Sequence, residues 1–181
     1  MSNAEYLEKY GIDTSTSPGD SFNRALSDFT HDVASGGAIR HLCDKGYTVS
    51  QIMKMLDYPT PRERVEKTFT RHLSESGTLL SELPDGYESI ALDKMSYLLD
   101  KDGEQTENAL ILCEFGRVKL KSVADYEKLL LLLDADEAEY IKGIRWTGKP
   151  MYHKLTPRMR GIAKRLAESG SYEVKLYGKQ M

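Results

Sequence analysis

Apolar residues in the first part of the chain recur at the spacing of an α-helix. Four of them fall on one helical face, at successive intervals of four, three and four residues: Phe22, Leu26, Phe29 and Val33. We expect this helix to end at Ser35-Gly36-Gly37. A second, short helix is expected over residues 38–43, with Gly46 as its left-handed terminating residue.

Two further helices are predicted by capping-box spacing. Thr48 with Gln51 and Thr60 with Glu63 both fit the pattern in which a Thr hydroxyl and the side chain three residues later satisfy exposed amides at a helix start. Pro61 strengthens the second start, since proline is favoured at the first helical position. The inward faces of these two helices are expected to carry Val49, Ile52, Met53, Leu56, Val65, Phe69 and Leu73.

Three short helices in sequence are typical of a helix-turn-helix module. Thr48 followed by Ile52 and Leu56 resembles the first helix of bacterial helix-turn-helix domains, and Val65 with Phe69 is similar to the paired apolar residues of their recognition helix. The resemblance covers residues 38–76 and implies contact with DNA. The connection at residues 57–61 is longer than the turn usual in such motifs. The same helices could equally form a packing unit or a protein-binding one.

The pattern changes after Pro84-Asp85-Gly86, a turn signal. Strands are expected in four segments, namely 87–92, 97–99, 109–115 and 172–176, and a strong turn at residues 100–103. Ser122, Asp134 and Thr156-Pro157 are expected to start helices. The leucine run 129–133 predicts a largely enclosed helix, and residues 144–153 predict a hairpin or a loop.

These elements predict an α+β fold in which a three- or four-helix cluster of helix-turn-helix type precedes a small mixed α+β domain. We expect a flexible tail at residues 1–20, the helical domain at 21–85 and the α+β domain at 86–181. The second domain is expected to dimerise, to bind an effector or to add a basic contact. A wing on the helix-turn-helix domain remains open as an alternative.

Charge is strongly segregated along the chain, although the net charge is only −3. Residues 77–141 carry a net charge of −9 and residues 142–181 one of +8. A clustered basic surface attracts polyanions such as nucleic acids. The alternative is intramolecular, with the acidic middle and the basic end of the chain packed against each other.

Two basic groups are candidates for nucleic-acid contact. The first lies on the outward face of the expected recognition helix and comprises Arg62, Arg64, Lys67 and Arg71. The second combines basic side chains with an aromatic stacking surface and comprises Arg145, Trp146, Lys149, Lys154, Arg158, Arg160, Lys164 and Arg165. A solvated basic helix with its aromatic residues in the core explains the second group equally well.

Enzymatic chemistry has little support in the sequence. The four histidines are isolated, and no nucleotide-binding, zinc-protease or nucleophile-elbow motif occurs. Cys43 and Cys113 lack metal-ligand spacing and are expected to be reduced and buried. We therefore expect no catalytic residue, cofactor or metal.

The first functional hypothesis is a small cytoplasmic DNA-binding regulator of helix-turn-helix type, with DNA or RNA as partner and a homodimer as a further expectation. The longest apolar run is too short to cross a bilayer, so no membrane is expected. The alternative is a non-enzymatic inhibitor or adaptor that binds a nucleic-acid-handling complex. Anti-CRISPR proteins resemble the chain in size and charge.

Overall fold

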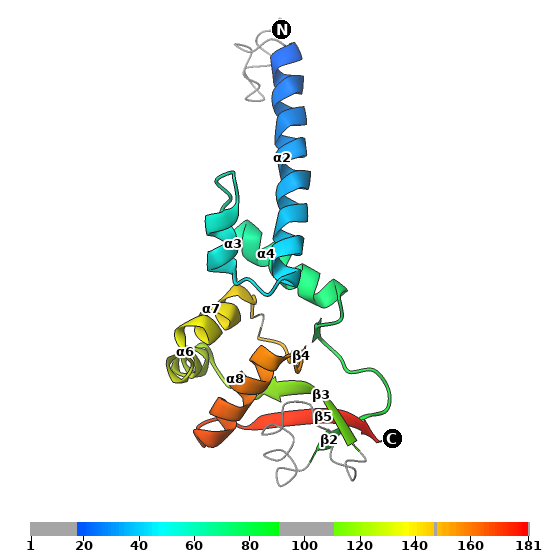
Figure 1. Ribbon diagram of the computed structural model, residues 1–181, viewed down its shortest axis with the longest axis vertical. Helices are drawn as coiled ribbons and strands as arrows, with labels where there is room; N and C mark the ends of the chain where they lie inside the picture. The colour runs from blue at the N-terminus through cyan, green and yellow to red at the C-terminus, as the bar shows by residue number, and fades with distance from the viewer. Residues whose placement is uncertain (1–17, 91–110, 147, 181) are drawn as a thin grey trace, which may run out of the picture.

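The computed structural model describes residues 18–90, 111–146 and 148–180 (Figure 1). Its helices are α2 (Pro18–Asp44), α3 (Val49–Met55), α4 (Arg62–Glu75), α6 (Val123–Leu132), α7 (Ala135–Gly143) and α8 (Pro157–Glu168). Its strands are β1 (Leu79–Leu80), β2 (Tyr87–Ile90), β3 (Ile111–Val118), β4 (Tyr152–Lys154) and β5 (Val174–Gln180). The predicted α+β class is confirmed, because a cluster of helices precedes the strands. The expected strand at residues 97–99 and the turn at 100–103 lie outside the described residues.

The strands form one antiparallel sheet in the order β1-β4-β3-β5-β2. The strand expected near the end of the chain is confirmed as β5, which lies between β3 and β2. Val174 and Leu176 in β5 are buried whereas Lys175 between them is exposed, as alternation along a strand requires. Helix α8 packs on this sheet through Met159 and Ile162 among others, so strands far apart in sequence share one covering helix.

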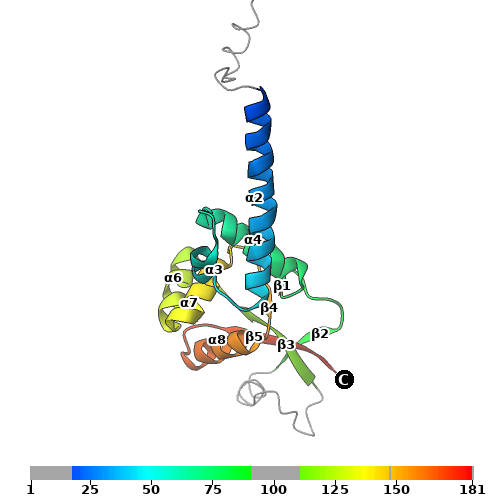
Figure 2. The ribbon, with the colours of Figure 1, turned by 45° about the horizontal axis from the view of Figure 1, so that its top comes forward.

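Helix α2 differs most from expectation. It continues through Ser35-Gly36-Gly37 without a break and ends at Asp44, so the two predicted helices are one helix of 27 residues. Figures 1 and 2 show its N-terminal half standing clear of every other described element, with the C-terminal half packed beside α3 and α4. Ser35 is buried and its hydroxyl donates to the His31 carbonyl at 2.6 Å. Burial of Ser35 and of Ile39 on either side of the glycine pair packs this part of the helix against the body.

The starts of α3 and α4 confirm one predicted capping box and show the other to be wrong. At α3 the Gln51 amide donates to the Thr48 hydroxyl, and the Gln51 side chain accepts from the Thr48 amide at 2.9 Å. At α4 the N-cap is Pro61, which carries no side-chain oxygen. The Thr60 hydroxyl instead donates to the Tyr58 carbonyl at 3.2 Å. The Thr60 hydroxyl is therefore engaged within the turn and does not cap α4.

The caps predicted for the later helices are confirmed. The side chains of Ser122, Asp134 and Thr156 each accept a backbone amide at the start of α6, α7 and α8. The enclosed leucine helix is not found, because Leu129 is buried while the Leu131 side chain is 84% exposed. Helix α6 lies at the edge of the molecule beside α7 (Figure 1) and also contacts α8, while the side that carries Leu131 and Leu132 is exposed.

Buried side chains from the helical part and from the sheet form one continuous cluster, which includes Ile39, Phe69, Ile162 and Leu176. The division at residue 85 stays a prediction. One close contact between the parts is at Gly143, the last residue of α7. A β-carbon there would lie 2.6 Å from Val49 Cγ2, so only glycine allows α7 to approach α3 this closely.

Candidate nucleic-acid interface

Helix α4 presents three distinct sides. Val65, Phe69 and Leu73 are among its buried residues. A second side faces α2, through the ion pair of Arg64 with Asp32 and the hydrogen bond between His72 and Asp44. The third side meets solvent and carries Glu63, Lys67 and Arg71, one helical turn apart. We call these three residues the α4 outer face.

The charged side chains of the α4 outer face form at most weak, solvent-exposed ion pairs. Arg71 Nε lies 4.0 Å from a Glu75 carboxylate oxygen, with both side chains more than half exposed. Glu63 approaches Arg145 at 3.6 Å. Within the described residues, no carboxylate pairs with the Lys67 ammonium group. Exposed pairs of this kind contribute only about 0–1 kcal/mol, so a phosphate could replace them.

The other two predicted arginines of α4 point away from this face. Arg62 Nε bonds to the Glu66 carboxylate at 2.7 Å, and its Nη1 donates to the Ser50 hydroxyl at 3.2 Å. Arg64 pairs with Asp32 of α2. The structure therefore separates the four predicted residues into two that remain outward and two that join α4 to its neighbours.

The predicted basic group on α8 is engaged with acidic residues of α7. Arg165 Nε donates to the Glu137 carboxylate at 2.9 Å, and the Glu137 side chain is only 11% exposed. Glu137 also accepts the Asp134 amide as part of the capping box of α7. Releasing Arg165 would leave a nearly buried carboxylate without its cation, which is costly.

Arg158 is held in a similar way. Its Nη2 donates to Asp136 at 3.1 Å, its Nη1 donates to the Gly46 carbonyl at 2.9 Å, and its guanidinium lies 4.7 Å from the Tyr140 ring centroid. The predicted intramolecular arrangement, with acidic and basic segments packed together, is thus present between α7 and α8.

The remaining predicted residues of the second basic group differ in their surroundings. Arg160 Nε donates to the Leu155 carbonyl at 3.2 Å. Lys149 and Lys154 are exposed, and within residues 18–90, 111–146 and 148–180 neither forms an ion pair with a carboxylate. Lys164 is half-buried on α8.

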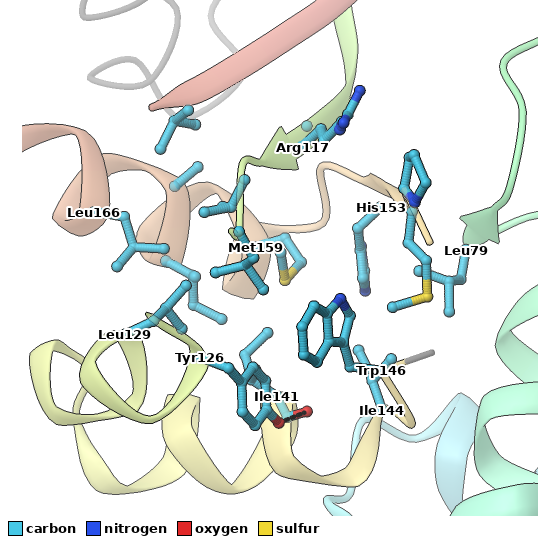
Figure 3. Close-up of a pocket in the computed structure, with 18 of the residues that line it drawn as sticks. Leu79, Arg117, Tyr126, Leu129, Ile141, Ile144, Trp146, His153, Met159 and Leu166 are labelled. Carbon is cyan, nitrogen blue, oxygen red and sulfur yellow. Dashed lines mark hydrogen bonds between the residues drawn. The ribbon is translucent and has the colours of Figure 1, made fainter. Parts of the chain in front are cut away.

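Trp146 is half-buried and packs against Tyr126 rather than standing free as a stacking surface. Its ring stacks on Tyr126 at 5.9 Å with an interplanar angle of 7°. The two rings form one wall of an apolar cavity of about 180 Å³ between the sheet and helices α6, α7 and α8 (Figure 3). Met159 and Leu129 lie across from them. Among residues 18–90, 111–146 and 148–180, no acidic side chain lines this cavity.

His153 borders the same cavity and is fully hydrogen-bonded. Its Nδ1 lies 2.6 Å from the Lys154 carbonyl oxygen, so this nitrogen must carry the proton and donate. Its Nε2 therefore accepts the Tyr140 hydroxyl proton at 2.8 Å. Burial lowers the pKa of His153 to about 4, and burial also raises the pKa of Tyr140. The pair is neutral at pH 7 and is suited to structure rather than to proton transfer.

Both cysteines are free and buried, as predicted. Burial raises the pKa of the Cys43 thiol to about 12, with a further contribution from Asp44. Burial likewise raises the pKa of Cys113 to about 11. Neither thiol has the exposure or the thiolate character of a nucleophile.

The described residues bring no three His, Cys, Asp or Glu side chains together as a metal-binding group. No helix among them combines the length and apolar character needed to cross a lipid bilayer.

Sequence reasoning did not anticipate two features. The cavity walls come from seven separate elements, and no local spacing links them. The apolar face of α2 was found at the right positions, but its exposure depends on the continuation of the helix through Gly36 and Gly37.

Comparison of the chain with protein-family models, with curated proteins and with solved structures found no match.

Proposed function

We propose that the chain is a small DNA-binding protein of helix-turn-helix type that contacts duplex DNA through the α4 outer face. The observation that carries the proposal is the position of Lys67 and Arg71. They lie one turn apart on the solvent side of the helix that follows the α3–α4 turn, and no described element covers them.

DNA binding at the α4 outer face would break weaker ion pairs than DNA binding at α8. Arg71 would exchange an exposed contact with Glu75, and Lys67 has no pair with a described carboxylate to lose. To contact DNA, Arg165 would have to break its ion pair with Glu137, whose carboxylate is nearly buried. Phosphate contacts by Lys and Arg supply most non-specific affinity for DNA, so the less costly face is the better candidate.

The test is a mobility-shift titration with random-sequence duplex DNA at two salt concentrations. The Lys67→Ala/Arg71→Ala variant should bind more weakly than the parent chain. The slope of log K against log salt should be smaller in magnitude by about two units for this variant, because each lost phosphate contact removes close to one unit of slope.

The matched control is Lys121→Ala/Lys128→Ala, which removes the same charge from exposed positions near and on α6. This variant should bind as the parent does. A second arm, Lys149→Ala/Lys154→Ala, tests the other exposed lysines. Equal losses in all three variants would mean that net charge alone drives binding. Absence of salt-sensitive binding in the parent would reject the proposal.

The alternative proposal is an adaptor or inhibitor that binds a nucleic-acid-handling protein complex. It would use either the acidic middle of the chain as a polyanion mimic or its basic end to hold a guide or target strand, yet Asp136 and Glu137 of the acidic segment already pair with arginines of α8. It therefore has less support than DNA binding. Capture of a nucleic-acid enzyme by the full chain, with no binding to DNA or RNA alone, would favour it.

A further inference from the structure

From Phe22 to Val33, helix α2 carries an apolar face that no described element covers. We call Phe22, Leu26, Phe29 and Val33 the α2 stripe. Their side chains are 67%, 50%, 64% and 58% exposed, although these residue types are ordinarily buried. Figures 1 and 2 show the N-terminal half of α2 projecting away from the body. Contiguous exposed apolar residues of this kind mark interaction sites.

The spacing of the α2 stripe indicates that its partner is another α-helix. Intervals of four, three and four residues are those of the a and d positions of a heptad repeat. Such a seam fits the equivalent seam of another helix. A helix also gains most of its stability in water from packing its apolar face, and α2 meets the body of the molecule at His31, which packs on Tyr58, at Asp32, which pairs with Arg64, and at residues after them.

The residues that flank the α2 stripe favour a second copy of the same chain. Asn23, Ala25 and Thr30 are uncharged, so two copies bring no like charges together at these positions. Asp32 is the charged flanking residue, and it is already paired with Arg64 of its own chain. Self-association therefore meets no electrostatic barrier along the seam.

The direction of the second helix follows from Arg40. This exposed residue stands one heptad after Val33, so parallel helices would place two Arg40 side chains opposite each other. Antiparallel helices avoid this contact. They set Phe22 of one copy against Val33 of the other, and Leu26 against Phe29, so that each aromatic ring meets an aliphatic side chain.

We propose that two copies of this chain associate through their α2 stripes as an antiparallel helix pair. The interface is isologous, with the two bodies at opposite ends of the pair. The proposal does not depend on DNA binding, because its test contains no nucleic acid.

The first experiment is sedimentation velocity of the full chain between about 1 and 300 µM, a range chosen because interfaces of this small size are weak. The parent should pass from monomer to dimer with increasing concentration. Leu26→Lys should raise the dissociation constant by about 100-fold or more, since it buries a charge in the seam. The control Ser27→Lys adds the same charge at an exposed position off the seam and should behave as the parent.

The second experiment determines the direction. Phe22→Cys and Val33→Cys chains are mixed under mild oxidation, and the antiparallel pair should form the mixed disulfide in preference to either symmetric one. A preference for the symmetric disulfides would overturn the antiparallel arrangement. A parent chain that stays monomeric at every concentration would overturn the proposal. The partner of the α2 stripe would then be residues 1–17 or a different protein.

Discussion

The N-terminal half of α2 and helix α8 share a sequence pattern but differ in its use. Each has large apolar residues on one face and polar residues elsewhere. In α8 that face is buried, and Leu166 and Ile162 are almost wholly inaccessible to solvent. In α2 the corresponding residues, Leu26 among them, are at least half exposed. An apolar face thus predicts that a helix needs a partner, without predicting which one.

The difference comes from what precedes and follows each helix. Helix α8 is joined to β4 and β5, and both strands pair with β3. Its ends are therefore fixed at the sheet, and its apolar face must lie on it. Helix α2 is anchored only through its C-terminal half, around Ile39 and Cys43, and nothing in the described chain brings its other half back to the body.

Truncation of one leucine in each helix is the strongest test of this comparison. Leu166→Ala should lower the free energy of unfolding by about 2–5 kcal/mol, because it opens a cavity in the core. Leu26→Ala removes the same atoms from an exposed position and should change the free energy of unfolding by less than about 0.5 kcal/mol. Urea denaturation at about 1 µM protein, where a weak pair dissociates, measures both. Equal losses would show that the α2 stripe is covered within the monomer.

Acidification should weaken the α8 side of the molecule through His153, two residues before the loop that leads into α8. Because the pKa of His153 is lowered to about 4 in the folded chain, the unfolded chain binds the proton more readily between about pH 4 and 6.5. Stability is therefore lost as the pH falls through this window, by roughly 2 kcal/mol between pH 7 and 5.

His153→Gln is the control for the acid effect, since glutamine does not titrate but retains hydrogen-bonding groups. Its urea midpoint should change less than that of the parent between pH 7 and 5. The Leu26→Ala variant should follow the parent. Parallel behaviour of parent and His153→Gln would assign the acid sensitivity to other groups.

The smallest expected effect concerns charge. Arg165→Ala should cost about 1–2 kcal/mol, because the nearly buried Glu137 carboxylate loses a charged donor. Arg24→Ala removes the same charge from the free half of α2, where the side chain is exposed, and should change stability by less than about 0.5 kcal/mol. Thermal unfolding of both variants measures the difference. A cost for Arg24 equal to that for Arg165 would contradict the free position of this half of α2.

Much of the fold could be predicted because its signals are local. The caps at Thr48, Asp134 and Thr156 depend on residues within one turn, and all three form. The Thr60 cap failed although its spacing was correct, because the hydroxyl had a nearer acceptor in the Tyr58 carbonyl. Spacing indicates which bond can form, whereas competing acceptors decide which one does.

The candidate site was less predictable, because charge along the chain does not reveal pairing in space. Arg64 and Arg71 look equivalent in the sequence, yet Arg64 meets Asp32 from another helix while Arg71 stays outward. The leucine run of α6 shows the same limit, since Leu129 and Leu131 differ only in which side of the helix they occupy. Both outcomes depend on tertiary neighbours that no local pattern specifies.

The burial of both native thiols has a practical consequence for labelling. With their pKa values raised well above neutrality, Cys43 and Cys113 should react very slowly with maleimides and thiosulfonates. A cysteine substituted on an exposed surface would then take up a dye or spin label selectively in the otherwise native chain. Distances between labels could therefore be measured without first building a cysteine-free background.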